Sequence, residues 1–218
     1  MSEVSQDDWL AEWRKPGSEA AVRNGLAEQW PEVECTREVE KPMALLLTDE
    51  KELVSNPENL DASVQEVFEL MLGACCHRED GRRLRTAEGV EWVTAVVGFG
   101  GSLSGACMLR CGGRVAAEIA ARMTGTECYR VDETVKDAIG EICNMVAGAW
   151  KSRAPNLAAN CGLSVPAVIA GCDYNLRVHA KEFQLLHTYL FDDQAFEVTI
   201  VCDGLQGLQG RLSTSIQS

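Results

Sequence analysis

The chain has 218 residues, of which 46% are hydrophobic, and a formal net charge of −13. This composition is ordinary for a soluble globular protein, and the length allows one substantial domain with an extension. The negative charge disfavours nonspecific binding to nucleic acid or to an anionic membrane. No apolar run approaches the roughly 20 residues that span a bilayer, and the acidic N-terminus is unlike a signal peptide. We therefore expect a cytoplasmic protein.

The N-terminal quarter differs in composition from the rest. Residues 1–59 hold 14 acidic and 6 basic side chains, a net of 6 − 14 = −8. Three tryptophans and an apolar run at 43–47 make this segment too hydrophobic for a plain disordered tail. We predict an acidic appendage over 1–58, with short helices and one strand at 43–47, whose role the sequence does not indicate. One domain then occupies 59–218.

The domain is expected to open with a helix. Asn59 or Asp61 can cap its N-terminus, and apolar residues then recur at every third or fourth position as far as Leu72. Gly73 stands where this helix should end. A basic, glycine-bearing loop follows over 77–89.

A β-hairpin and a second helix come next. The stretch 90–99 is rich in β-branched residues, and the glycine-rich turn after it leads into a second strand at 106–110. Residues 114–123 then have the pattern of a helix, closed by Gly125.

The second half repeats this order of a helix followed by strands. A long helix is predicted from Asp132 to Arg153, ending before Pro155. Three strands follow, with Asp192 and Asp193 forming the turn between the last two, at 164–173, 176–190 and 195–203. The chain is therefore predicted to have an α/β fold of the α+β type. Two long helices would pack on a mostly antiparallel sheet built from duplicated helix-plus-strands units.

The long helix carries an unusual polar face. At 100° per residue, one set of side chains falls within about 80° of arc: Asp137, Glu141, Asn144, Gly148 and Lys151. The opposite side is an apolar stripe that includes Ile142 and Val146. Gly140 and Gly148 flank the carboxylate and the amide, although glycine within a helix costs about 1 kcal/mol relative to alanine. We interpret these glycines as a smooth surface that lets another molecule approach closely.

These residues resemble those of a known family. An acidic residue, then Glu-x-x-Asn, then a proline in a later apolar run is the pattern of the CheC/CheX/FliY chemotaxis phosphatases. In this chain the pattern is formed by Asp137, Glu141, Asn144 and Pro166. The likeness is greatest to the single-site CheX type and covers roughly residues 60 to 213, through the stretches 67–73, 101–105, 116–125 and 164–171.

The resemblance implies a CheX/CheC-like fold and a phosphatase that removes the aspartyl phosphate of a CheY-like receiver domain in chemotaxis or related two-component signalling. Asn144 would orient the attacking water, and Glu141 would pair with a lysine of the receiver. The expected partner-binding residues are Asp137, Gly140, Gly148 and Lys151. No metal site or cofactor of the chain's own is implied, because Mg²⁺ would come with the receiver. The family likeness also suggests a homodimer. A non-catalytic adaptor that binds a receiver or a flagellar component is the alternative.

The first helix carries a related but altered pattern. Asp61, Gln65 and Phe68 stand where Asp137, Glu141 and Asn144 stand in the second unit. Phe68 cannot orient water, so only the second unit would keep a working site. Asp61 and Gln65 could equally be the solvated face of the first helix.

The ten cysteines raise the question of a metal-binding or redox function. They form no C-x-x-C motif, and the three histidines show no metal-ligand spacing near them. We expect them to be reduced, small, buried apolar residues. A redox-responsive cysteine protein is a third, weaker interpretation.

Overall fold

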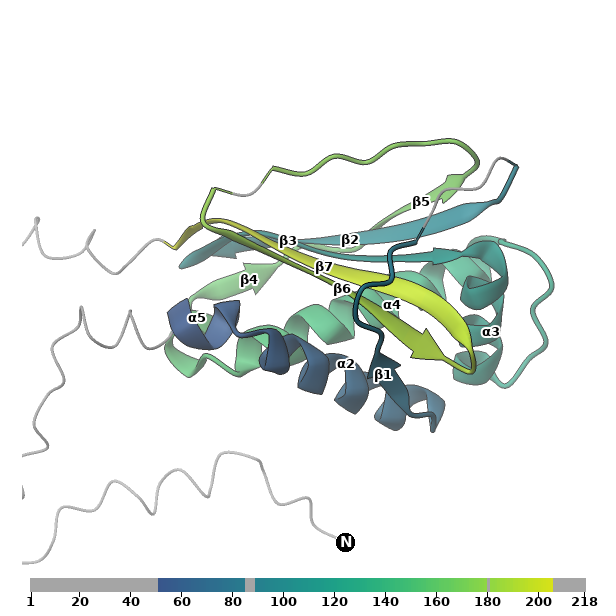
Figure 1. Cartoon of the computed structure of the whole chain (residues 1–218), viewed down its shortest axis with the longest axis horizontal. Helices are drawn as coiled ribbons and strands as arrows, with labels where there is room; N and C mark the ends of the chain where they lie inside the picture. The colour runs from purple at the N-terminus through teal and green to yellow at the C-terminus, as the bar shows by residue number, and fades with distance from the viewer. Residues whose placement is uncertain (1–50, 85–88, 180, 206–218) are drawn as a thin grey trace, which may run out of the picture. The chain divides into compact units, whose positions relative to one another are not determined.

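One antiparallel sheet, with helices packed on one of its faces, forms the body of the protein (Figure 1). The computed structural model describes residues 51–84, 89–179 and 181–205. Its seven strands follow the order β1-β6-β7-β3-β2-β4, with β5 also paired to β2. The predicted α+β architecture is confirmed. The expected appendage lies almost entirely outside the described residues, as does its strand at 43–47.

The elements follow one another in two runs of helix and strand. Residues 51–55 are helical and lead into the first run. The elements in chain order are α2 (Pro57–Leu72), β1 (Cys76–Arg78), β2 (Trp92–Gly101), β3 (Leu103–Gly112), α3 (Gly113–Thr124), α4 (Glu133–Ser152), α5 (Pro155–Ala159), β4 (Cys161–Leu163), β5 (Ala167–Gly171), β6 (Phe183–Phe191) and β7 (Gln194–Leu205).

Side chains at the helix starts explain where two of the helices begin. Asp132 caps α4, its carboxylate accepting the Val135 N–H at 3.1 Å, as the sequence predicts. For α2 the cap is Asn56, which accepts the Glu58 N–H at 2.9 Å. The expected caps Asn59 and Asp61 lie one turn inside the helix instead. Pro57 explains the earlier start, because proline fits the first turn of a helix.

The core lies between the helices and the inner face of the sheet. The apolar stripe of α4 is fully buried at Ile142, Val146 and Trp150. The Trp150 ring lies 5.2 Å from that of Phe99 on β2. Phe68 of α2 stacks on Phe196 of β7, with ring centroids 4.6 Å apart. Aromatic packing of this kind fixes each of the two long helices to the same face of the sheet.

The strands differ from the predicted ones where the chain leaves the sheet. The expected strand 176–190 begins only at Phe183, because the segment before it crosses the outer face of the sheet (Figure 1). Of the expected strand 164–173 only Ala167–Gly171 is a strand, β5, and a separate short strand, β4, precedes it at Cys161–Leu163. The three-residue strand β1 occupies part of the predicted loop 77–89. The turn at Asp192 and Asp193 is confirmed, with φ values of 44° and 62°.

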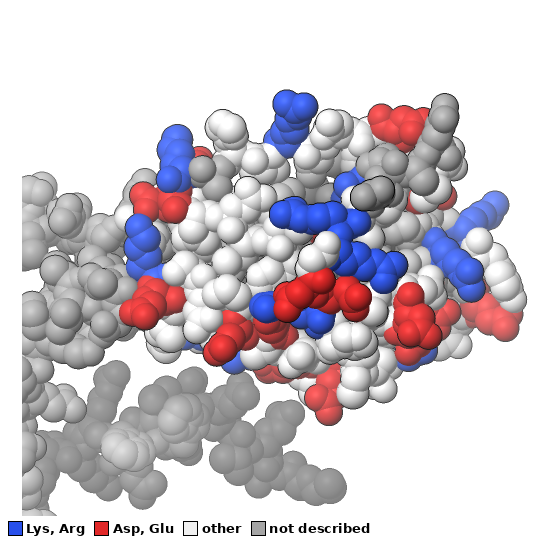
Figure 2. Space-filling view, viewed as in Figure 1, with Lys and Arg blue, Asp and Glu red and all other residues white. Residues whose placement is uncertain are grey.

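The charged surface is mixed rather than of one sign. On the face seen in Figure 2, acidic and basic side chains are interspersed over the described part of the chain. Several form ion pairs, such as Lys51 with Glu182 at 2.7 Å. Exposed pairs of this kind each contribute at most about 1 kcal/mol. The fold therefore depends on its buried apolar core rather than on these pairs.

Most of the described cysteines are core residues. The buried ones are Cys76, Cys107, Cys111, Cys143, Cys161 and Cys202. Burial raises the pKa of Cys76 and of Cys111 to about 12, which keeps both thiols protonated and unreactive. The expectation of burial is wrong for Cys75 and Cys172, which are exposed, and Cys35 lies outside the described residues.

The two faces of α4 should respond differently to truncation. Ile142→Ala removes a fully buried side chain and is expected to cost about 2–5 kcal/mol of unfolding free energy. Asn144→Ala should cost far less, because Asn144 is only half-buried and forms no hydrogen bond within the described residues. Urea melts of the two variants measure the difference. The opposite order of stabilities would contradict the assignment of the helix faces.

Candidate functional site

A carboxylate and a carboxamide stand one turn apart on the outward side of α4. Glu141 is exposed and Asn144 is half-buried, while Asp137 is exposed one turn before Glu141. Within the described residues, none of these three side chains forms a hydrogen bond or an ion pair with the rest of the chain. Their polar groups are therefore available to a molecule that docks on this face.

A segment of the same chain runs beside this face. A Cβ atom at Gly140 would lie 3.3 Å from Pro166 Cβ and from Val168 Cγ2, and one at Gly148 would lie 4.0 Å from Leu163 Cδ1. The prediction that Gly140 lies on the solvent face is therefore wrong. Gly140 is buried because the segment between β4 and β5 covers it. Gly148 remains half-exposed.

The two glycines locate Asn144 relative to that segment. Helix residues four apart lie one above the other, so Gly140, Asn144 and Gly148 form a single row on α4. The row meets Pro166 at one end and Leu163 at the other. Asn144 therefore lies at the level of the residues between them, and the predicted motif proline is part of the wall of the site.

The side chain of Lys151 forms hydrogen bonds within the chain. Its ammonium group donates to the carbonyl oxygen of Cys161 and lies 3.5 Å from that of Ala158. These contacts hold the turn from α5 to β4 against the end of α4. The side chain is half-buried, and these contacts give Lys151 a structural role that the sequence does not suggest, while its predicted contact with a partner stays a prediction.

The region that contains α4 is similar to known proteins. Residues 93–188 match the family described as chemotaxis phosphatase CheX. The CheY-P phosphatase CheX of Thermotoga maritima is 28% identical over 86 residues, which are 39% of this chain and 56% of that protein. The chain thus matches little more than half the length of this curated relative. The matched family region contains all of α4 and the segment that lies beside it.

Two solved structures have the same fold. The chemotaxis protein CheX of Vibrio vulnificus superposes with a TM-score of 0.57 at 20% identity, over 66% of this chain and 94% of that one. CheX in the CheX–CheY–BeF₃–Mg²⁺ complex of Borrelia burgdorferi superposes with a TM-score of 0.51 at 20% identity, over 67% and 97%. The resemblance to the CheX family is confirmed.

The first unit of this CheX-like fold has no equivalent open site. Asp61 binds three side chains through its carboxylate: Arg78 at 2.8 Å, Tyr189 at 2.8 Å and His187 at 2.9 Å. Burial and the neighbouring Asp61 carboxylate raise the pKa of Tyr189, which keeps its hydroxyl protonated as a donor. Phe68 is fully buried against the sheet. At the motif positions, the α2 carboxylate is therefore already bound within the chain and the position that corresponds to Asn144 is an apolar core residue.

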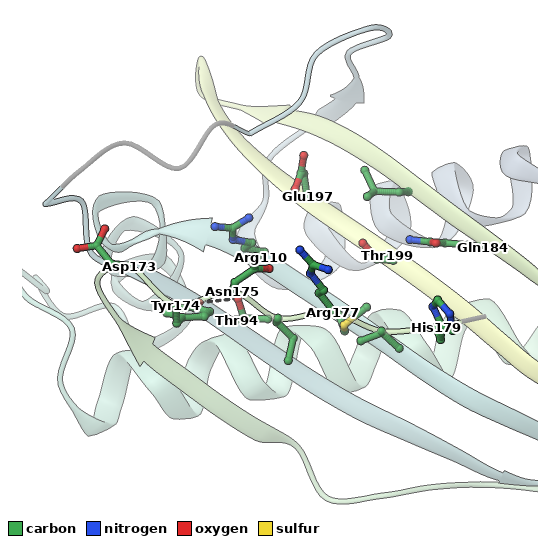
Figure 3. A pocket seen from close by; sticks show the side chains of 14 residues that line it. Thr94, Arg110, Asp173, Tyr174, Asn175, Arg177, His179, Gln184, Glu197 and Thr199 are labelled. Atoms are coloured by element: carbon green, nitrogen blue, oxygen red, sulfur yellow. Dashed lines mark hydrogen bonds between the residues drawn. The ribbon is translucent and has the colours of Figure 1, made fainter.

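A cavity lies on the face of the sheet opposite the helices. The irregular segment after β5 forms its roof, held by a 2.6 Å hydrogen bond between Tyr174 and Thr94, and the cavity beneath measures about 630 Å³. Figure 3 shows Arg177 on this segment and Thr199 on β7, and both line the cavity. No motif in the sequence indicates this cavity, because its residues come from distant strands. The sheet separates it from Glu141 and Asn144.

The CheX-like fold carries no metal cluster within its described residues, where no three His, Cys, Asp or Glu side chains gather with metal-binding geometry. None of the helices in that part of the chain is long and apolar enough to cross a membrane.

The glycines of α4 allow a matched pair of variants. Gly148→Ala should stabilise the protein by up to about 1 kcal/mol, since alanine favours the helix and its Cβ meets only Leu163 at 4.0 Å. Gly140→Ala should gain less or lose stability, because its Cβ forces Pro166 and Val168 to shift. Urea melts with equal m-values give the comparison. Equal gains in unfolding free energy would mean that Pro166 and Val168 shift away from the new Cβ atom without cost.

Proposed function

We propose that this chain dephosphorylates the aspartyl phosphate of a CheY-like receiver domain, in chemotaxis or a related two-component pathway. The proposal is carried by Glu141 and Asn144, which stand one turn apart on α4 with no partner in the described chain. Two comparisons support it. The curated relative is called a CheY-P phosphatase, and the Borrelia structure contains CheX together with CheY, BeF₃ and Mg²⁺.

The reaction needs little covalent assistance. A water oxygen forms a bond to phosphorus while the bond from phosphorus to the aspartate oxygen breaks, and the proton lost by water leaves with inorganic phosphate. Such a transfer depends on a water held in line with the breaking bond. The Asn144 carboxamide suits this task because it is neutral and both donates and accepts hydrogen bonds. Its half-buried position beside the 163–168 segment restricts its motion before the receiver arrives.

The other residues of the face bind rather than react. Glu141 would pair with a lysine of the receiver and fix the register of the two proteins. Asp137 would extend this contact, and the missing side chain at Gly148 would let the receiver approach the helix backbone. Mg²⁺ would arrive with the receiver, so the chain needs no cofactor of its own. We also propose that the protein acts in the cytoplasm and as a homodimer.

Asn144→Ala should separate binding from chemistry. Affinity for the receiver is expected to stay nearly unchanged, while dephosphorylation falls on the order of 10²-fold or more, towards the receiver's own rate. Asn144→Gln should also be slow, because one added methylene displaces the amide. Phosphate release from a phosphorylated receiver of the same organism measures the loss, with the exposed Gln65→Ala on α2 as control. An Asn144→Ala variant as fast as the wild type would refute the role of Asn144.

Glu141→Gln should weaken the complex and make its affinity less dependent on salt, since it removes one charge pair from the interface. Titrations over a salt series, with the receiver held in its activated form by beryllofluoride, measure both effects. Glu69→Gln makes the same charge change at an exposed position on α2 and should alter neither. Identical salt dependence for wild type and Glu141→Gln would remove Glu141 from the interface. A wild-type chain that binds the receiver but never accelerates phosphate release would favour the adaptor function instead.

A further inference from the structure

The sheet edge beside α4 contains a β-bulge. Strand β4 pairs with β2 so that Leu163 lies opposite Phe99, and β5 pairs so that Ala167 lies opposite Val96. Between these pairs β2 has two residues, 97 and 98, whereas the edge has three, 164–166. One extra residue is therefore inserted at the edge. Bulges re-aim side chains and are frequent beside functional sites.

Hydrogen bonds hold the bulge in a defined conformation. The Ser164 N–H donates to the Gly98 carbonyl at 2.9 Å, and the Ser164 hydroxyl accepts the Gly98 N–H at 2.8 Å. The same hydroxyl donates to the Val165 carbonyl at 2.9 Å. On the other side Pro166, whose ring fixes its backbone φ, lies against Gly140. Both neighbours of Val165 are thus anchored.

The extra residue changes which side chains face the helix. Leu163 faces α4 at Gly148, and beyond the bulge Pro166 and Val168 face it at Gly140. Regular alternation from Leu163 would have turned Val165 inward and Val168 outward. The bulge instead leaves Val165 86% exposed, the most exposed of the large hydrophobic side chains in the described residues. Along the chain it falls between Leu163 and Pro166, which contact the two glycines on either side of Asn144 in the helix row.

We propose that Val165 is an apolar docking contact for the receiver domain and that the bulge serves to present it beside Asn144. This inference rests on the proposed function and adds a determinant of partner choice to it. Glu141 and Asn144 are polar groups that meet the phosphorylated site itself. Val165 extends the same surface with a rigid apolar contact, so the receiver must carry an apolar residue at the border of its phosphorylation site. Because the bulge is already ordered, little conformational entropy is lost when the receiver binds.

Substitutions at Val165 test the contact in the full-length chain. Val165→Asp is expected to weaken binding of the beryllofluoride-activated receiver about tenfold, the effect of one buried apolar contact. In turnover assays the KM for the phosphorylated receiver should rise while kcat stays near that of the wild type. Val165→Ile should keep wild-type affinity because it retains the apolar contact. Leu70→Asp is the matched control, because Leu70 is 73% exposed on α2 and should tolerate the charge without loss of receiver affinity.

The outcomes separate this inference from the proposed function. A receiver that binds wild type and Val165→Asp equally, or an equal loss in Leu70→Asp, overturns the role of Val165 alone. So does a Val165→Asp variant that dissociates a dimer of this chain while receiver affinity is unchanged, which would assign the residue to contact with a second copy. A wild-type chain that binds no receiver of its organism overturns the proposed function and this inference together. Thermal melts of Val165→Asp should match the wild type, because the side chain is exposed.

Discussion

The close approach of the edge segment 163–168 to helix α4 is the contact on which the candidate site depends. It occurs at Gly140, where no side chain separates the helix backbone from Pro166 and Val168. On its other side α4 is fixed by Trp150 and Ile142, which are fully buried against the sheet. The helix is thereby held between the sheet and its own edge strand. The row that carries Asn144 is consequently placed by packing on two sides.

Because of this arrangement, Gly140 and Gly148 do not have the common role that the sequence suggests for them. Gly140 accommodates the chain's own strand, and only Gly148 keeps open space in front of the backbone. Lys151 likewise works within the chain, closing the turn that brings β4 back beside the helix. The surface left for a partner is therefore narrow. In the proposed complex it would consist of Asp137, Glu141 and Asn144, bordered by Gly148 and by the bulge.

The sequence predicts best those features that depend on neighbouring residues. The 3.6-residue period of α4, its Asp132 cap and the turn at Asp192 and Asp193 are all encoded locally. Gly140 could not be placed in this way, because it lies about 60° from Asp137 on the helical wheel, at the border between the two faces. Its burial is decided by a segment more than twenty residues later in the chain. The bulge at Val165, the short strand β1 and the cavity beneath Arg177 likewise require strands that the sequence keeps far apart.

The carboxylate network in the first unit has a consequence for stoichiometry. Asp61 ties α2 to the sheet edge through Arg78 and Tyr189, and the place that corresponds to Asn144 is filled by the buried ring of Phe68. Under the proposed function, each chain would therefore engage one receiver, although its two helix-plus-strands units could in principle serve two, and the first unit would act as a scaffold for the second. A second docking event on the same assembly would have to use another copy of the chain. The number of receivers that the assembly engages would then report its number of subunits.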